Sequence, residues 1–424
     1  MNKKLGLVLG GGGARGCYEA GAWQAFEEQG IHFDCVAGSS IGAIIGALYV
    51  QQGKDKAIEF ILKISPSRIV EGWSDLPKDM EQLIADRQKI GAFISKYLTQ
   101  GSDITPLKES IRGMLDFKAF KESKVDFACM TFNASKWVPQ PFFKKDITAD
   151  NMQDVLIASA SCFPAFPMLE MKGESFIDGG YADNLPVDLA KQMGAEEIIA
   201  IDVKGPGFVK PRIEDGTVRY FEPILQLGNF LDFNKALARK TLKIGYLETN
   251  KYLNVCCGWI YTFLSSDWPN IYVLEHYIEA KLEELDIQIS IETINRTQQQ
   301  VMGYKAIIPK TKFMSEYKYT RLIEMLGAMA KIDPVKLYRW SDFMDILFEK
   351  LDVISKKTDG KDDWTSWEKQ VLLEERTVGF YRFLKAGKGK LPLVAGPLAS
   401  MFENTYSMAV IWYCLDVFYR KNKK

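Results

Sequence analysis

The N-terminal region contains two consecutive units in which a short apolar run ends in a glycine-rich turn and a helix follows. The first run, 5–9, ends in four glycines, and a helical pattern then extends from Arg15 to Gly30. The second run, 33–37, leads into Gly-Ser-Ser-Ile-Gly at 38–42 and a helix of small residues. Strand, tight turn and helix in repeated succession are typical of parallel sheets covered by helices. We therefore predict an α/β fold with a mainly parallel central sheet.

Further elements are expected along the chain before its character changes. We predict strands at Val125–Phe132, Glu174–Ile177 and Glu197–Val203, and a helix near Pro186–Met193. The sheet is expected to end near Val203. Long charged and aromatic-rich segments with helical periodicity follow. The chain should therefore consist of an α/β domain over residues 1–208 and a mostly helical region of unknown role over 209–424.

Composition excludes several partners and locations. The 424 residues carry 54 basic and 54 acidic side chains, so no overall field favours binding to nucleic acid. The seven cysteines form no CxxC pair and no zinc-like cluster, which indicates a reducing compartment and no structural metal. The first apolar run reaches its glycines before any cleavage site of a secretory signal. Since no apolar segment is long enough to span a membrane, we expect a cytoplasmic protein.

Residues 38–42 fit the pattern G-x-S-x-G, in which a serine lies on a sharp turn between a strand and a helix. Gly38 and Gly42 give this turn room to hold Ser40 in a strained conformation with its hydroxyl exposed. The N-terminus of the following helix favours negative charge beside Ser40. Ser40 is therefore a candidate nucleophile, and the alternative is a plain strand-to-helix turn.

The first glycine turn, 11–16, matches G-x-G-x-x-G and allows two interpretations. A dinucleotide site needs an acidic residue at the carboxyl end of the second strand, whereas Asp34 lies at the start of that strand. In the other interpretation, the backbone N–H groups of Gly11, Gly12 and Gly13 stabilise an oxyanion on the neighbouring turn. Arg15 then braces the loop, unless it is simply a surface residue that opens a helix.

A serine nucleophile needs a base, and the chain has only two histidines. His32 lies at the far end of the strand before Ser40, about 26 Å away at the rise of an extended strand, which excludes it. His276 lies in the second part without a turn signal around it, and stays the less favoured alternative. Asp178 ends a predicted strand before Gly179-Gly180, at the sheet edge where Ser40 emerges. An Asp-Gly pair also fits a hairpin turn, so the Ser40–Asp178 pair is a hypothesis.

Together, GGGARG at 11–16, GSSIG at 38–42 and DGG at 178–180 resemble the motifs of the patatin-like phospholipase family, in the same order. Two further segments add to this resemblance. ASASCFPAFP at 158–167 is similar to the family's A-S-x-x-x-x-P-x-x-F-P segment, and Asn184-Leu185-Pro186 is similar to its N-x-P. The resemblance covers about residues 5–205 and leaves 210–424 unassigned.

The resemblance implies a three-layer α/β/α fold and a serine acyl hydrolase that needs no catalytic histidine, metal or cofactor. Ser40 would be the nucleophile, Asp178 its base, and Gly11, Gly12 and Gly13 the oxyanion donors. The supporting loop positions would be Arg15, Gly16, Gly38, Gly42, Gly179 and Gly180. The implied substrate is a fatty-acyl ester of a lipid or phospholipid, as in a phospholipase A or lysophospholipase. The alternative is a partner-activated or non-enzymatic interaction module whose helical region acts as a lid or binding surface.

An acyl chain needs an apolar channel beside Ser40, and the candidates for its wall are Phe163, Phe166, Met168 and Leu169. Each of these side chains also suits ordinary core packing. At the other end, residues 407–424 combine aromatic rings with a basic terminus, which suits peripheral contact with an anionic membrane. The alternative for this tail is a packed last helix with a solvated end. No pattern predicts an oligomeric state.

Overall fold

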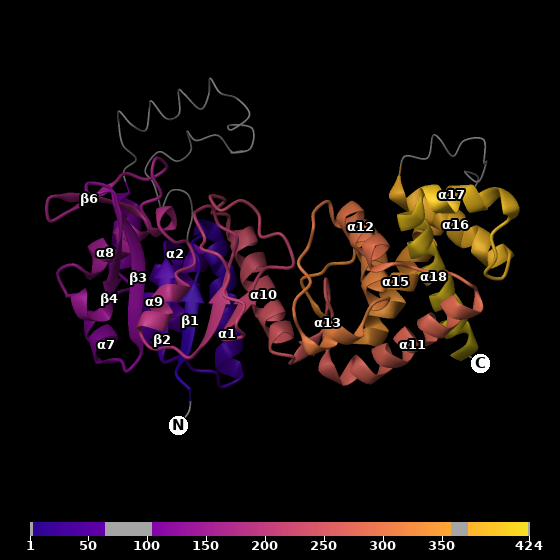
Figure 1. Cartoon of the computed structure of the whole chain (residues 1–424), viewed down its shortest axis with the longest axis horizontal. Coiled ribbons are helices and arrows are strands. Elements are labelled where there is room, and N and C mark those ends of the chain that lie inside the picture. Colours follow the sequence, from indigo (N-terminus) through magenta and orange to yellow (C-terminus); the bar gives the residue numbers. More distant parts are fainter. Residues whose placement is uncertain (1–2, 64–103, 358–371, 423–424) are drawn as a thin grey trace, which may run out of the picture. The chain divides into compact units, whose positions relative to one another are not determined.

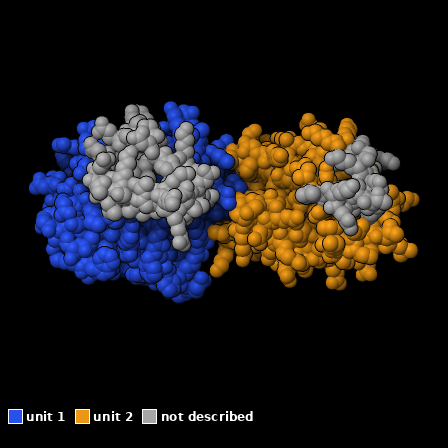
Figure 2. Space-filling view, turned by 90° about the horizontal axis from the view of Figure 1, so that it is seen from above, with its two compact units in different colours: residues 1–249 blue, residues 250–424 orange. Residues whose placement is uncertain are grey.

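The computed structural model of the chain describes residues 3–63, 104–357 and 372–422 (Figure 1). The chain divides into two compact units, Met1–Thr249 and Asn250–Lys424, which Figure 2 colours separately. The first unit contains every residue of the two glycine turns and of the Asp178 segment. We therefore describe each unit by itself, beginning with the first.

A sheet of eight strands, counted over the described residues, forms the centre of the first unit. In chain order the strands are β1 Leu5–Leu9, β2 Cys35–Ser39, β3 Asp126–Asn133, β4 Val138–Phe143, β5 Leu169–Met171, β6 Glu174–Asp178, β7 Glu197–Ile201 and β8 Val218–Phe221. Their order across the sheet is β5-β6-β3-β2-β1-β7-β8, and β4 also pairs with β3. The neighbours from β3 to β8 are parallel, whereas β4, β5 and β6 pair in antiparallel fashion. The prediction of a mainly parallel sheet is confirmed.

Helices of the first unit connect these strands and cover them. They are α1 Gly16–Glu28, α2 Ile41–Val50, α3 Lys54–Lys63, α6 Thr105–Arg112, α7 Phe117–Glu122, α8 Met152–Ser159, α9 Val187–Gln192 and α10 Lys235–Tyr252. Both glycine turns lie where a strand passes into a helix. The first turn joins β1 to α1 through a short 3-10 helix, and the second joins β2 directly to α2.

Strand register explains why helices cover both faces of the sheet. Pairing aligns Val8 with Ala37 and Ala200, and Ala37 with Ala128, so these four side chains form one row on one face. Helix α9 packs on this row, since its buried apolar residues belong to the same hydrophobic cluster. Because side chains alternate along a strand, the residues next to these four in sequence point to the opposite face, which other helices must cover.

The opposite face is covered by α2. A Cβ placed on Gly46 of this helix would lie 2.9 Å from Val36 and 3.3 Å from Phe127, which are the neighbours of Ala37 and Ala128 in sequence. The small residues of α2 thus allow it to pack closely on β2 and β3. The sheet lies between two helical layers, which confirms the three-layer α/β/α prediction.

Helix α10 packs against α1 so closely that their backbones touch. A Cβ on Gly21 would collide with the carbonyl oxygen of Leu242, and a Cβ on Gly245 would collide with that of Tyr18. The Tyr18 hydroxyl also donates a hydrogen bond to Glu248 over 3.0 Å. These contacts make α10 part of the first unit.

The first unit therefore extends further than the sequence pattern predicts. Strand β8 pairs in parallel with β7, so the sheet continues by one strand beyond the predicted end near Val203. The predicted domain boundary lies between residues 208 and 209, whereas the compact units divide after Thr249. The physical reason is that β8 and α10 bury their apolar faces against the sheet and α1.

The second unit is mostly helical, with a small sheet of three short strands among its described residues. Its helices are α11 Trp268–Glu284, α12 Ile291–Met302, α13 Lys312–Glu316, α14 Thr320–Met329, α15 Trp340–Lys357, α16 Leu373–Ala386, α17 Gly396–Met401 and α18 Glu403–Asn422. The strands are β9 Cys256–Cys257, β10 Thr262–Leu264 and β11 Leu337–Tyr338. The fully buried carboxylate of Glu324 accepts backbone N–H groups of Trp259 and Tyr261, which fixes the loop before β10.

The last helix, α18, forms the core of this second unit. All residues from Met408 to Leu415 are buried, and Trp412 stacks on Tyr381 of α16 with ring centroids 4.0 Å apart. The aromatic part of the predicted membrane-binding tail is therefore packing surface, which decides in favour of a packed last helix. The side chains of its basic end, 420–424, lie outside the described residues. No helix in the described part of the chain is long and apolar enough to span a membrane.

Glu19 of α1 is an acidic residue buried without compensation. Its side chain is 1% exposed, and neither carboxyl oxygen has a hydrogen-bond partner among the described residues. Burial, followed by the negative charge of Asp202, raises the pKa of Glu19 well above its usual 4.5. Burial in the folded protein therefore favours the protonated form of Glu19.

We expect Glu19→Gln to stabilise the protein at neutral and mildly alkaline pH. Above pH 4.5 the unfolded chain releases the Glu19 proton while the folded chain retains it, so the stability of the native protein falls as the pH rises. Urea unfolding should show a stability gain in the variant that shrinks as the pH is lowered towards 4.5. The exposed Glu122→Gln variant is the control and should show no such trend. A gain that is independent of pH would contradict a protonated Glu19.

Candidate active site

Ser40 lies on the turn between β2 and α2. Its backbone has φ 55° and ψ −127°, a conformation that a non-glycine residue adopts only where its surroundings enforce it. Close backbone contact enforces it here. A Cβ on Gly38 would lie 2.5 Å from the carbonyl carbon of Gly42, and one on Gly42 would lie 2.6 Å from that of Leu9. Only glycine therefore fits at positions 38 and 42. The turn presents the Ser40 hydroxyl at the N-terminus of α2.

A buried serine from another helix holds this turn in place. Ser159, the last residue of α8, accepts a hydrogen bond from the Ser40 backbone N–H over 3.0 Å. The Ser159 hydroxyl in turn donates to the carbonyl oxygen of Met130 in β3, over 2.7 Å. The Ser40 turn is thus tied to the neighbouring strand through one side chain.

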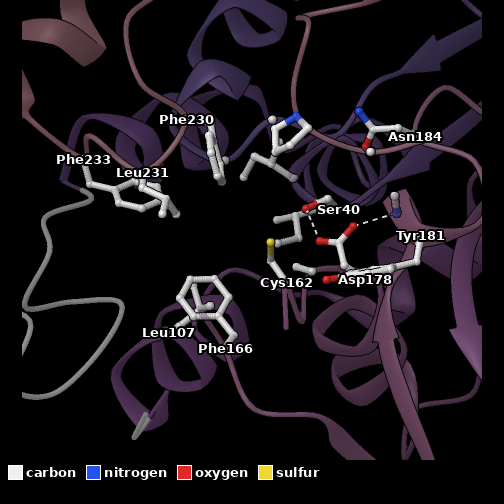
Figure 3. A pocket seen from close by; sticks show the side chains of 18 of the residues that line it. Ser40, Leu107, Cys162, Phe166, Asp178, Tyr181, Asn184, Phe230, Leu231 and Phe233 are labelled. Atoms are coloured by element: carbon white, nitrogen blue, oxygen red, sulfur yellow. Dashed lines mark hydrogen bonds between the residues drawn. The ribbon is translucent and has the colours of Figure 1, made fainter. Parts of the chain in front are cut away.

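Asp178 is the last residue of β6, and its carboxylate lies beside Ser40 (Figure 3). The Ser40 hydroxyl donates a hydrogen bond to Asp178 Oδ2 over 2.6 Å, and the Gly180 N–H donates to Oδ1 over 2.7 Å. Gly179 and Gly180 belong to a 3-10 turn after the strand, so the hairpin alternative for this segment is wrong. The two side chains are neighbours although 138 positions separate them.

Asp178 reaches this point by a different path from the one expected. The prediction placed it at the end of a strand, at the sheet edge where Ser40 emerges, in a sheet expected to be mainly parallel. In the structure β6 is antiparallel to β3 and pairs with the part of β3 that extends beyond β2. Met130 of β3 is aligned with Ser39, and the next residue, Thr131, is aligned with Asp178. The strand therefore runs back towards the turn and ends beside Ser40.

The environment of Asp178 opposes its ionisation. The residue is 5% exposed, and burial raises the pKa of its carboxyl group from 3.8 to about 6. Hydrogen bonds from the Ser40 hydroxyl and the Gly180 N–H act in the other direction, because they stabilise the charged form. Asp178 is consequently a stronger base than an exposed aspartate, and it is still deprotonated at neutral pH.

The three glycines proposed as oxyanion donors have different environments. Gly12 and Gly13 line the cavity that contains Ser40, and their N–H groups have no acceptor among the described residues. The N–H of Gly11 instead donates to the backbone carbonyl of Asn184 over 3.0 Å. Gly11 therefore anchors the loop, and its N–H is not directed at an oxyanion.

Two side chains form hydrogen bonds that fix this glycine loop and the segments beside it. The Asn184 amide donates to the carbonyl oxygens of Gly11, over 3.0 Å, and Gly205, over 3.4 Å. The Arg15 guanidinium donates to the carbonyl of Gly228, over 2.9 Å, and to that of Lys204. Arg15 is thus a bracing residue rather than a free surface residue. Gly16 follows it as the first residue of α1, in contact with Ile41 of the Ser40 turn.

An apolar cavity of about 370 Å³ lies beside Ser40 and Asp178 (Figure 3). Of the four predicted wall residues, Phe166 lines it. Leu169 is buried in β5, Met168 is 39% exposed, and the Phe163 carbonyl accepts a hydrogen bond from the Tyr181 hydroxyl. The other apolar side chains of the wall come from several elements: Ile41, Ile44, Phe60, Leu107, Phe208, Phe230, Leu231 and Phe233.

Neither histidine belongs to this cavity. His32 is exposed and precedes β2, whereas Ser40 follows the same strand. His276 is an exposed residue of α11 in the second unit, and its Nδ1 lies 3.0 Å from the carbonyl oxygen of Tyr272. Asp34, the acid considered for a dinucleotide, accepts the Leu5 N–H over 2.8 Å at the amino end of the sheet. In the described part of the chain, no group of three or more acidic, cysteine or histidine side chains is arranged to hold a metal.

Comparison with known proteins agrees with this geometry. The model of the patatin-like phospholipase family matches residues 7–191, which include both glycine turns and Asp178. Residues 7–191 are a patatin-like phospholipase domain. The chain also aligns with Lysophospholipase NTE1 of Mycosarcoma maydis, 30% identical over 222 residues, and with Patatin-like phospholipase domain-containing protein 7 of Rattus norvegicus, 32% identical over 209 residues.

These relatives are far longer than the part that aligns. The alignments cover 50% and 47% of this chain, but only 10% and 13% of the two relatives. Among solved structures, VipD from Legionella pneumophila aligns over 98% of this chain and 91% of its own, with 12% sequence identity and a TM-score of 0.39. This score is too low to define the fold of the second unit. The comparisons therefore identify the patatin-like domain alone.

Sequence patterns missed several residues that shape the site. Ser159 and Asn184 lie in segments that resemble family motifs, but the motifs do not show that these side chains fix backbone atoms. Both side chains are polar and buried, and their burial becomes visible only in the structure. Phe230, Leu231 and Phe233 follow the last predicted strand and carry no sequence signal that connects them with Ser40.

We expect Ser159→Ala to lower the free energy of unfolding by about 1–3 kcal/mol, because it leaves the partly buried Ser40 N–H without its acceptor. Urea denaturation measures this loss. Ser110→Ala is the matched control, since the Ser110 hydroxyl donates only to Pro106 of its own helix. The control should change stability by less than about 0.5 kcal/mol. Equal effects of the two substitutions would show that Ser159 does not support the turn.

Proposed function

We propose that this protein is a serine acyl hydrolase that cleaves fatty-acyl esters of lipids, with Ser40 as nucleophile and Asp178 as base. The observation that carries the proposal is the 2.6 Å hydrogen bond from the Ser40 hydroxyl to a buried carboxylate, at the edge of an apolar cavity. The raised pKa of Asp178 supports its role, because a base whose pKa lies nearer neutrality accepts a proton more readily. The patatin-like domain and the relatives named lysophospholipases support the same reaction class.

The reaction begins when Ser40 Oγ attacks the ester carbonyl and its proton passes to Asp178. The N–H groups of Gly12 and Gly13, with the N-terminus of α2, stabilise the oxyanion of the tetrahedral intermediate. The intermediate expels the alcohol, which takes the proton from Asp178 and leaves an acyl-enzyme on Ser40. Water then gives a proton to Asp178 as it attacks the acyl group. Collapse of this second intermediate releases the fatty acid and returns the proton to Ser40.

The cavity supports a substrate with one acyl chain in the site. Its wall is formed mostly by aromatic and aliphatic side chains, which favours a hydrocarbon chain over a peptide or sugar. A dry cavity of about 150 Å³ accommodates benzene, so a volume of about 370 Å³ suits one chain of roughly a dozen carbon atoms. A lysophospholipid or a single chain of a phospholipid meets this requirement.

We expect Ser40→Ala to abolish ester hydrolysis and labelling by a fluorophosphonate probe. Asp178→Asn keeps the shape of the side chain but removes the base, and should lower kcat/KM by about 10²–10⁴-fold. Turnover of a short-chain p-nitrophenyl ester measures both effects, and circular dichroism verifies that the variants are folded.

His276→Ala is the control and should retain full activity. A fully active Asp178→Asn variant would refute the dyad, and an inactive His276→Ala variant would point to a triad instead. Absence of labelling in the native protein would favour the alternative of a partner-activated or non-enzymatic module.

The pH dependence of kcat/KM provides an independent test. The base acts in its deprotonated form, so activity should fall as the pH drops below about 6, the pKa to which burial raises Asp178. Above this pH the rate should reach a plateau until other groups titrate. An acidic limb near the ordinary aspartate value of 3.8 would contradict a buried Asp178 base. Intrinsic fluorescence over the same range separates titration of the site from unfolding.

A further inference from the structure

One surface of the second unit combines exposed apolar side chains with lysines. Leu393 is 99% exposed, Val394 71% and Met401 74%, around the 3-10 turn Leu393–Ala395 and helix α17 (Figure 1). The last turn of α16 contains Lys385, and the loop that follows this helix contains Lys388 and Lys390; all three lysines are exposed. These six residues are called the basic–apolar surface below.

The apolar residues of this surface are held outwards by the local structure. Ala395 is fully buried and Ala399 is 7% exposed, so one side of the segment is anchored in the unit. The side chains of Leu393 and Val394 immediately before this anchor project away from it. Pro392 and Pro397 limit the backbone freedom on both sides of the turn. Large aliphatic side chains that are exposed together in this way mark a surface for binding.

The charge of the segment is entirely positive. Between Lys385 and Phe402 the sequence contains three lysines and no acidic residue, although acidic and basic residues are balanced in the chain as a whole. Lys388 and Lys390 make no ion pair with any described residue. Lys385 lies 3.8 Å from Asp416 and donates a hydrogen bond to the Tyr381 hydroxyl. Two of the three positive charges are therefore available to an anionic partner.

We propose that the basic–apolar surface docks the protein on an anionic membrane, with Leu393 and Val394 inserted between lipid chains and the lysines against headgroups. A lipid interface accepts projecting aliphatic side chains without a complementary shape, and its negative surface attracts lysines within a Debye length. A second copy of the chain fits less well, because a symmetric contact would bring two positive surfaces together. The docking surface does not depend on the proposed hydrolase activity.

Vesicle co-sedimentation of the full chain tests the proposal. The Ser40→Ala background prevents consumption of the lipid, so the result is independent of the proposed reaction. The protein should bind vesicles of phosphatidylcholine with phosphatidylserine, but not phosphatidylcholine alone, and added salt should weaken binding. Lys388→Ala with Lys390→Ala should reduce the partition coefficient about 30-fold, at about 1 kcal/mol for each lysine. Leu393→Ser with Val394→Ser should reduce it by about tenfold or more.

Matched double variants on other exposed positions of the second unit serve as controls. Val273→Ser with Val353→Ser removes two exposed aliphatic side chains elsewhere on the unit, and Lys331→Ala with Lys336→Ala removes the same charge as the lysine test variant. Both should bind vesicles as the parent protein does, and thermal unfolding verifies that all variants are folded. The proposal is overturned if the parent protein does not bind anionic vesicles, or if the controls lose as much binding as the test variants. It is also overturned if Leu393→Ser with Val394→Ser abolishes a dimer, seen by light scattering, without affecting vesicle binding.

Discussion

Gly42 in the turn after β2 lies against the carbonyl group of Leu9, so closely that no side chain fits between them. This contact joins the ends of β1 and β2, and it brings the two glycine loops that follow these strands together. It also fixes the backbone of Ser40 in a conformation that its own side chain disfavours. Three neighbours keep this strained backbone in place: the sheet, the first turn of α2 and the buried hydroxyl of Ser159. Displacement of any of these would allow the turn to relax and the hydroxyl to move.

Electrostatics at the site depend on a balance around one carboxyl group. Burial destabilises the charge of Asp178, while two hydrogen bonds stabilise it, and the resulting pKa of about 6 lies between that of an exposed aspartate and neutrality. The opposing effects come from separate parts of the fold, because the apolar wall lies on several helices and both donors belong to tight turns. The basicity of Asp178 is therefore set by its surroundings as much as by its residue type.

Periodicity and turn chemistry predict the central part of the fold well. The strands β1, β2, β3, β6 and β7 and helices α1, α2 and α9 follow from local apolar patterns, which glycines bound in most cases, because each element is short. The direction of β6 could not be predicted, since strand pairing depends on contacts between residues far apart in sequence. The same limit applies to the assignment of α10 to the first unit, which depends on the close approach of Gly21 to Leu242 and of Gly245 to Tyr18. For the candidate site, local patterns indicate Ser40, Asp178 and the glycine loops, but not that the Gly11 N–H is already engaged.

The wall of the cavity has a mixed origin within the chain. Ser40, Asp178, Gly12 and Phe166 all lie inside the segment that matches the patatin-like family, whereas Phe208, Phe230, Leu231 and Phe233 lie beyond its end at residue 191. The groups proposed for bond cleavage and part of the surface that would choose the chain are thus encoded by different stretches of sequence. For the proposed hydrolase, substitutions in the second stretch would alter the choice of acyl chain without disturbing the groups of the first.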